Sequence, residues 1–264
     1  MRLERSERKV RLKEKRYERD RLMKEKRSEE LDAFEEVFDR STLTILYGML
    51  NRGELARIHG VVDAGKEARI YLGEGPKRAK VAVKIYLVTT AEFVRGRIPY
   101  IEGDPRFRRV RRDTRSLVYL WAQKEFKNLQ TCRLASVPVP RPILVRGNVL
   151  LMQFIGSDGN PAPLLKDVEL DDPETTYRSL LHMILKLYTK AHLVHGDLSE
   201  YNIMMWRGRP IIFDVSQAVH VEHPMAQLLL KRDLKNINNY FERYSIRLVP
   251  IESTYSTAVK SAAD

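Results

Sequence analysis

The sequence contains a single cysteine, Cys132, among its 264 residues. One thiol excludes a disulfide within this sequence and a zinc site built from cysteines, and it favours a reduced, cytoplasmic compartment. Long hydrophobic runs are also missing, because the longest, VLLMQFI at 149–155, is much shorter than the roughly 20 apolar residues that span a bilayer. The N-terminus is charged throughout and lacks the apolar core of a signal peptide. We therefore expect a protein that has no membrane contact and is not exported.

An acidic excess is absent as well, since the formal net charge is +12. Residues 1–27 contain 13 Lys and Arg against 6 Asp and Glu, and residues 95–115 contain 8 Arg against 3 acidic residues. The remainder of the chain is neutral. Two basic segments on an otherwise balanced protein predict a polyanionic partner such as RNA, although a solvated helix and a flexible loop have the same composition.

The pattern of apolar residues divides the chain into four parts. Residues 1–30 alternate basic and acidic side chains, which predicts a charged N-terminal helix or a disordered extension. The pattern over 31–155 predicts an N-terminal lobe with helices and an antiparallel sheet, interrupted by a flexible, Arg-rich loop at 90–112. Residues 156–250 predict a helical C-terminal lobe, and residues 251–264 a C-terminal tail. The expected fold class is therefore α+β with two lobes, and ligands prefer the junction between such lobes.

Turn and cap residues place the main elements. A helix that begins at Asp39 or Ser41 and ends at Gly53 is expected to bury Leu43, Leu46, Tyr47 and Leu50. Strands are expected on both sides of a turn at Ala64-Gly65, over 80–88, and in hairpins that turn at Gly147-Asn148 and Arg207-Gly208. Further helices are expected over 112–135, 175–194 and 225–246.

Five polar residues stand in an order that suits phosphoryl transfer, a reaction that needs positioning, a metal ion and a group that orients the nucleophile. Asp197 and Asn202, in HGDLSEYN, fit the spacing D-x-x-x-x-N, and Asp214 follows the apolar run PIIF. Lys84, in VAVKIY, matches a strand lysine that holds nucleotide phosphates, and Glu125 is a candidate partner for it. Alone, an Asp is usually a helix cap and a Lys is usually solvated; only the complete set indicates a kinase-like site.

Histidines offer a second candidate chemistry. His195 precedes Asp197 closely, and its ordinary pKa near neutrality suits a catalytic base. We favour a structural role, in which the imidazole fixes the shape of the loop. His182 and His192 are expected to be ordinary helix-surface or core residues, and the spacing of the histidines matches no zinc motif.

Four segments together resemble the RIO kinases, an atypical protein kinase family. They are DAGKEARIY at 63–71, YIEGDPRFR at 100–108, LVHGDLSEYNI at 193–203 and IIFDVSQAV at 211–219. The resemblance covers about 37–246 and is nearest to the type 1 subfamily, because the type 2 subfamily carries an N-terminal winged-helix domain for which the residues before Gly60 are too few and too charged. The compact sequence also suggests an archaeal member.

The resemblance implies a role for each matching residue. Asp197 would be the catalytic Asp; Asn202 and Asp214 would bind magnesium or manganese, and Asp214 would also accept phosphate from ATP as an aspartyl-phosphate. Lys84, paired with Glu125, would contact the phosphates. The remaining nucleotide contacts implied by the resemblance are Gly65, Lys66, Glu67, Met152, Gln153, Ile155, Ser199 and Glu200.

Two positions depart from the family pattern. Asp63-Ala64 stands where the family has Ser-Thr, which removes hydroxyl contacts to phosphate and adds a negative charge. Gln153 stands at an adenine-facing position often filled by Glu, where a backbone contact survives the change. Neither departure touches the predicted metal ligands.

The resemblance implies a two-lobed RIO fold and an ATP-dependent serine/threonine kinase or ATPase that acts in maturation of the small ribosomal subunit. The subunit precursor and its RNA would bind through 1–27 and 95–115. No A-P-E segment for peptide binding follows Asp214, which implies few substrates, self-phosphorylation or ATP hydrolysis as a conformational switch. Two alternatives stay open: a small-molecule phosphotransferase of the aminoglycoside or choline kinase type, and an ATP-binding scaffold for RNA assembly.

Overall fold

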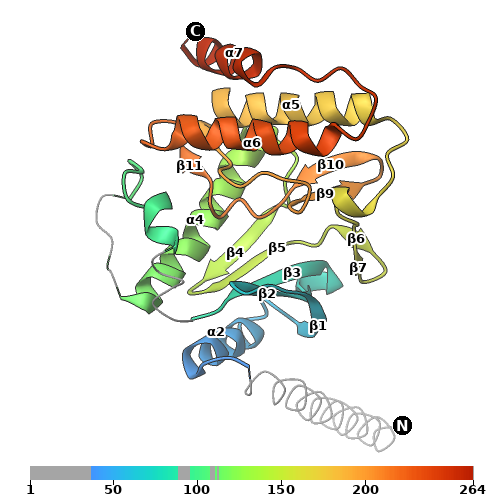
Figure 1. Ribbon diagram of the computed structural model, residues 1–264. Coiled ribbons are helices and arrows are strands. Elements are labelled where there is room, and N and C mark those ends of the chain that lie inside the picture. Colours follow the sequence, from blue (N-terminus) through green and yellow to red (C-terminus); the bar gives the residue numbers. More distant parts are fainter. Residues whose placement is uncertain (1–36, 89–95, 108–110, 112, 264) are drawn as a thin grey trace, which may run out of the picture.

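A computed structural model describes residues 37–88, 96–107, 111 and 113–263. A five-stranded sheet forms the lower part of the molecule in Figure 1, and a group of helices with the C-terminus forms the upper part. The predicted α+β class with a sheet-rich first part and a helix-rich second part is confirmed. The charged extension at 1–30 and the first residues of the predicted N-terminal lobe, 31–36, lie outside the described residues.

The sheet is antiparallel with the order β1-β2-β3-β5-β4. Its strands are β1 Arg57–Ala64, β2 Ala68–Glu74, β3 Lys80–Tyr86, β4 Pro142–Arg146 and β5 Val149–Gln153, and the short helix η1, Pro76–Arg78, precedes β3. Strand β3 is central and buried on both faces except at its first residue. Because side chains alternate along a strand, Val83 faces the cluster under α2 while Lys84 and Tyr86 face the opposite side. Lys84 therefore points away from α2, from the opposite face of the sheet.

Helix α2, Arg40–Asn51, covers one face of the sheet. Asp39 caps it, since its Oδ1 accepts hydrogen bonds from the backbone N–H of Ser41 at 2.8 Å and of Thr42 at 3.2 Å. Leu46 is fully buried, but Tyr47 is 37% exposed, so the prediction that Tyr47 points inward is wrong. The contact stripe follows Thr42, Leu46 and Met49, and Tyr47 is rotated by about 100° from Leu46 around the helix axis.

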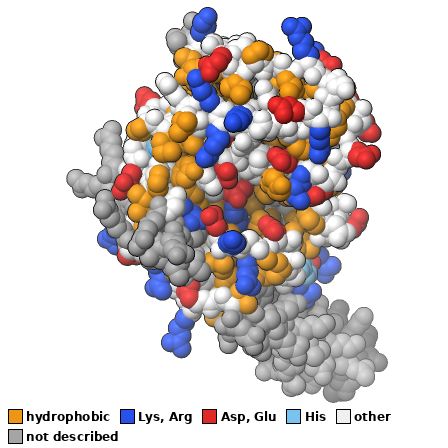
Figure 2. Space-filling model, viewed as in Figure 1, with side chains coloured by type: hydrophobic (Ala, Val, Ile, Leu, Met, Phe, Trp, Pro, Cys, Tyr) orange, Lys and Arg blue, Asp and Glu red, His pale blue; other side chains and the backbone are white. Residues whose placement is uncertain are grey.

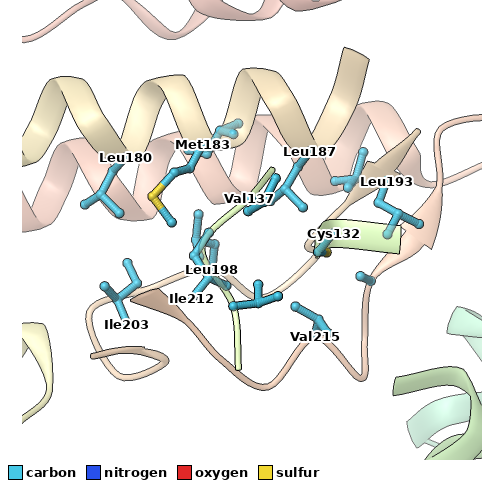
Figure 3. Packing of buried hydrophobic residues seen from close by; sticks show 14 of the residues in the cluster. Cys132, Val137, Leu180, Met183, Leu187, Leu193, Leu198, Ile203, Ile212 and Val215 are labelled. Carbon is cyan, nitrogen blue, oxygen red and sulfur yellow. The ribbon is translucent and has the colours of Figure 1, made fainter. Parts of the chain in front are cut away.

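The helical part is built on α5 Pro173–Thr189, α6 Ala226–Phe241 and α7 Ile251–Ala263. Short strands and one short helix complete it: β6 Gly156–Ser157, β7 Asn160–Pro161, η3 Leu165–Asp167, β8 Leu193–Val194, β9 Ile203–Trp206, β10 Arg209–Ile212 and β11 Val219–His220. Figure 3 shows Leu180, Met183 and Leu187 of α5 pointing at the apolar side chains below them. No helix in the described ranges is both long enough and apolar enough to cross a bilayer.

The segment 251–264, predicted as a tail, differs from expectation. Residues 251–263 form α7, which packs against α5 and α6, and its Thr254 and Ala258 are buried. The amphipathic spacing of these two residues, four apart, places them on one face of the helix. The helical part therefore continues to the end of the described chain.

The Arg-rich segment is more ordered than a structureless loop. Its described portion, 96–107, contains the short helix η2, Ile98–Tyr100, and buries Arg97, Ile101 and Asp104. Gly103 has φ +90° and lies so close to Pro224 that a Cβ would approach the proline Cδ to 2.9 Å. The rest of the predicted loop, at 89–95, 108–110 and 112, lies outside the described residues. Helix α4, Thr114–Leu134, follows it and runs behind the sheet.

Candidate nucleotide and metal site

A cavity of about 390 Å³ lies where the sheet meets the helical part. Figure 2 shows acidic and basic side chains gathered in a hollow between the two parts. The sequence-predicted residues Met152, Gln153, Ile155, Asn202 and Asp214 all line the cavity. Its other walls are mostly apolar and include Val62, Ile70, Ala82, Phe154, Pro163, Leu164, Met204 and Phe213. An apolar slot with polar groups at one end suits a flat heterocycle attached to a charged group.

Lys84 lies between two carboxylates. Its Nζ is 2.9 Å from Glu125 Oε1 and 2.9 Å from Asp214 Oδ1, and only 4% of its side chain is exposed. The hydroxyl of Tyr86, on the same face of β3, donates to the other oxygen of Glu125. Burial alone would lower the pKa of Lys84, but Asp214 and Glu125 reverse this effect and hold it above its ordinary value. The predicted pairing of Lys84 with Glu125 is confirmed, and the lysine stays cationic.

Asp214 lies in the turn after β10, with a left-handed backbone at φ 57°. The Ser216 hydroxyl donates to its Oδ1 at 2.7 Å, the oxygen that Lys84 also contacts. Its side chain lines the cavity and is 44% exposed. The surrounding protein raises its pKa, but Lys84 and the Ser216 hydroxyl outweigh this effect and lower the pKa to about 2. The group is therefore an anion at neutral pH.

Asp197 and Asn202 are held by one turn between β8 and β9. The Nδ2 group of Asn202 donates to the backbone carbonyl of Asp197, and its Oδ1 accepts from Ser199 N–H at 3.0 Å. Gln217 Nε2 donates to Asp197 Oδ2 at 3.0 Å. Desolvation, together with the charge of Asp214, raises the pKa of Asp197 against the opposing effect of Arg232. A carboxylate with a raised pKa is a better proton acceptor than an ordinary one.

Asn202 and Asp214 are brought together by strand pairing. Strands β9 and β10 pair with Ile203 opposite Ile212, and Phe213 N–H donates to the Asn202 carbonyl at 3.0 Å. In the described part of the chain, no group of three or more His, Cys, Asp and Glu side chains is arranged to hold a metal ion. An amide and a carboxylate on one cavity wall instead fit a magnesium ion, which commonly takes one or two protein oxygens and completes its shell with water and phosphate.

The predicted phosphate loop is an exposed turn at the rim. Gly65, Lys66 and Glu67 connect β1 to β2, and Asp63 just before them lines the cavity. Glu67 forms an ion pair with Arg97, and its carbonyl accepts from Leu87 N–H at 3.0 Å. The contacts of Glu67 therefore hold the turn at its β2 end.

Ser199 and Glu200 are half-buried in the turn that carries Asp197. They stand beside the residues of the cavity wall and are not part of it. For Ser199 the structure shows a structural contact, because its Oγ accepts from Tyr201 N–H at 3.4 Å.

Asp233 is a buried residue beside the site that no sequence motif identifies. This residue of α6 is 1% exposed, and its two carboxylate oxygens accept from Gly196 N–H at 2.8 Å and Leu198 N–H at 2.9 Å. Arg232 donates to the Gly196 carbonyl. Burial raises the pKa of Asp233 to about 7. A signal was available, since Asp233 lies four residues after the buried Leu229 and therefore on the inner face of the helix.

A family model described as the RIO domain matches residues 69–254 of this chain. The RIO-type serine/threonine-protein kinase Rio1 of Methanocaldococcus jannaschii is 40% identical over 230 residues, covering 86% of this chain and 78% of the relative. The protein of the same name from Haloferax volcanii is 37% identical over 221 residues, covering 84% and 76%. The human serine/threonine-protein kinase RIO1 is 37% identical over 225 residues, which cover 84% of this chain but 39% of the human protein.

Solved structures show the same relationship. The Rio2 kinase from Chaetomium thermophilum, in a complex described as ADP/Mg²⁺-phosphoaspartate, superposes with a TM-score of 0.65 and 26% sequence identity. The match covers 84% of this chain and 66% of the other. A second structure of that kinase gives a TM-score of 0.67 at the same identity.

Proposed function

This chain belongs to the RIO domain family, whose relatives include serine/threonine-protein kinases, and we propose on this basis that it binds ATP in the cavity and transfers its terminal phosphoryl group. The observation that carries the proposal is the position of Lys84 Nζ, 2.9 Å from both Glu125 and Asp214 beside a cavity that Asn202 also lines. Such a fixed cation next to a metal-binding pair is what phosphoryl transfer requires. Family membership argues against the small-molecule phosphotransferases.

Each residue then has a definite task. Met152, Gln153 and Ile155 contact the adenine in the apolar slot, and Lys84 binds phosphate oxygens while Glu125 keeps it in place. A magnesium or manganese ion held by Asn202 and Asp214 would neutralise charge on the phosphates when bound. Asp197, with its raised pKa, orients the attacking hydroxyl and accepts its proton.

For the ATPase route we propose Asp214 as the nucleophile. One carboxylate oxygen attacks the terminal phosphorus, a new O–P bond forms, and the bond to the bridging oxygen breaks so that ADP leaves with the electron pair. Water then cleaves the aspartyl-phosphate to restore the carboxylate and release phosphate. The proposal is supported by the low pKa of Asp214, about 2, and by the phosphoaspartate named in the similar Rio2 kinase structure.

We further propose that the enzyme acts in the cytoplasm on small ribosomal subunit precursors, that RNA binds its basic segments, and that it phosphorylates itself. RNA binding is supported by the charge of 1–27 and 95–115, which is unusual on a chain that is otherwise neutral. Phosphate contacts by such segments are sequence-independent and salt-sensitive. ATP turnover would then act as a switch in assembly.

Asp197→Asn and Asp214→Asn test these roles with near-isosteric changes. We expect Asp197→Asn to lower phosphoryl transfer on the order of 10²–10⁴-fold while sparing ATP affinity, because only the proton acceptor is lost. Asp214→Asn should abolish metal-dependent turnover and any hydroxylamine-sensitive phosphoenzyme. Asp171→Asn, an exposed carboxylate before α5, is the control. Normal turnover in either site variant would remove that residue from the mechanism.

The scaffold alternative is separated by measuring steady-state ATP hydrolysis by the full chain with and without precursor ribosomal subunits. We expect hydrolysis that changes when subunits are present. ATP binding without turnover under both conditions would favour the scaffold. Efficient peptide phosphorylation with hydrolysis indifferent to subunits would instead contradict the switch.

A further inference from the structure

A buried polar cluster contacts the backbone that follows Asp214, and none of its members lines the cavity. It consists of Lys124 and Asn128 of α4 together with Asp104 and Arg106 of the Arg-rich segment. Lys124 and Asn128 are completely buried, and Asp104 is 2% exposed. Buried polar groups are costly unless hydrogen bonds replace their water. The partners of these groups therefore show what the cluster holds.

Two side chains of α4 bind the backbone that follows Asp214. Lys124 Nζ donates to the carbonyls of Ser216 and Ala218, both at 2.7 Å. Asn128 Nδ2 donates to the Val215 carbonyl at 2.8 Å and to the Ala218 carbonyl at 3.2 Å. Positions 124 and 128 are one helical turn apart and share a face. One stripe of α4 therefore fixes the carbonyls of three of the four residues after Asp214.

Arg106 adds a third attachment from a different part of the chain. Its guanidinium donates to Asn128 Oδ1 at 2.7 Å and to the Ala218 carbonyl at 3.3 Å. It also forms a bidentate pair with Asp104, at 2.8 and 2.6 Å, and Asp104 accepts from His220 N–H at 3.3 Å. Planar bidentate pairs fix orientation as well as distance. The Arg-rich segment is thereby joined to the backbone after Asp214 at Ala218 and at His220.

The hydrogen bonds to the 215–220 backbone matter because Asp214, just before it, has an uncommon backbone conformation. Its φ of 57° is sparsely populated for a residue other than glycine, and such conformations persist where the surroundings impose them. Helix α4 also carries Glu125, which fixes Lys84. The same helix thus fixes both the lysine, through Glu125, and the backbone after Asp214, through Lys124 and Asn128.

We propose that Lys124, Asn128 and Arg106 are positioning residues that aim the Asp214 carboxylate at the metal and nucleotide. None of them lines the cavity, so they act through the 215–218 backbone. The inference rests on the proposed function, since it assigns a direction to the group that would bind the metal. It also gives the described end of the Arg-rich segment a task apart from RNA binding.

Lys124→Met removes the donor and keeps most of the side-chain volume. The matched control is Lys127→Met, because Lys127 is exposed on the same helix. The first measurement is amide hydrogen exchange of residues 214–220 in the full chain without metal or nucleotide. We expect faster exchange in Lys124→Met than in wild type, and no change in Lys127→Met.

The second measurement is the magnesium concentration that half-saturates ATP hydrolysis. Loss of groups that orient a metal ligand typically weakens metal affinity on the order of 10–100-fold, so we expect a rise of that size in Lys124→Met. ATP affinity measured without metal should be unchanged. A merely structural role would reduce the amount of folded enzyme and leave the half-saturating concentration of the remainder as it was.

Arg106 provides an independent test, since 27% of its side chain is exposed and its removal leaves less buried space. Arg106→Ala should raise the magnesium requirement in the same direction, and Arg106→Lys, which keeps one donor, should recover part of the loss. If Lys124→Met does not fold, Arg106→Ala and Asn128→Ser decide the question. Wild-type exchange at 214–220 together with a wild-type magnesium requirement in these variants overturns the inference, whereas a wild type without ATP turnover overturns the proposed function.

Discussion

Lys84 keeps its charge inside the protein because two carboxylates lie 2.9 Å from its ammonium group. Without the charge of Glu125, Asp214 is the one carboxylate left beside the ammonium group. Glu125→Gln should therefore leave Lys84 bound to Asp214 alone and draw both groups away from the phosphates.

At this scale the sequence predicted the residues that belong to spaced motifs, including Lys84 and Asp197. Lys124 and Asp233 belong to no such motif, and their importance comes from backbone groups that only the folded chain places beside them. A contact to a distant backbone carbonyl leaves no fixed spacing in a sequence. The one sequence signal that such residues give is their position on the apolar face of a predicted helix.

His195 links a residue to the pH dependence of stability. Burial lowers its pKa from 6.5 to about 4, so the folded state holds the imidazole neutral. The unfolded chain takes up a proton below pH 6.5 and the folded chain does not, so this contribution is complete above pH 6.5 and is lost as the pH falls toward 4. The size is about 3 kcal/mol from the shift in pKa.

We expect His195→Gln to flatten the pH dependence of unfolding between pH 6.5 and 4, measured as the denaturant midpoint at each pH. His182→Gln, an exposed position on α5, is the control and should follow wild type. A His195→Gln curve parallel to wild type over this window would show that the imidazole is not held neutral. A neutral imidazole does not by itself fix the shape of the loop, so the structural role favoured from the sequence stays a prediction.

Among the elements, helix α2 shows which features of a helix apolar periodicity predicts and which it does not. The helix, its Asp39 cap and its end before Gly53 follow from local sequence, but the direction of its apolar face does not. Leu46 and Tyr47 are both apolar enough to pack, and the sheet beneath selects Leu46. The same reasoning applies to α7, whose 13 residues stay helical on a surface made by α5 and α6.

Leu46→Ala and Tyr47→Ala make a matched pair on α2. Leu46 is fully buried, so its truncation should lower the free energy of unfolding by about 2–5 kcal/mol through lost burial and a cavity. Tyr47→Ala should cost less than about 1 kcal/mol, as surface substitutions usually do. Equal losses in chemical denaturation would mean that the sheet contacts the helix along a different stripe.

At the scale of the whole molecule, the sequence predicts the arrangement of the two parts but not the ordering of the Arg-rich segment. The fold class, the order of the elements and the location of the site between the two parts were predictable from the switch between strand and helix patterns. The ordering of 96–107 was not, because it depends on Gly103 meeting Pro224 and on Arg106 meeting Ala218, more than 100 residues away. Long-range contacts of this kind decide whether a polar segment is ordered.

Deletion of 1–27 should weaken RNA binding by the full chain at low salt and reduce the slope of log affinity against log salt, because phosphate contacts release counterions. ATP binding should be unaffected. The control replaces a comparable number of basic residues elsewhere on the surface. RNA affinity that is independent of this deletion at every salt concentration would remove 1–27 from the binding site.

The spacing of Lys124, Glu125 and Asn128 along α4 also limits how this protein changes in evolution. One residue inserted between them would turn the rest of the helix by about 100°, and Asn128 would no longer meet Val215. We therefore expect substitutions and not insertions there, collected at the exposed Gln123, Lys127 and Gln130. Those three positions are accordingly where a fluorescent probe can be attached without disturbing the register.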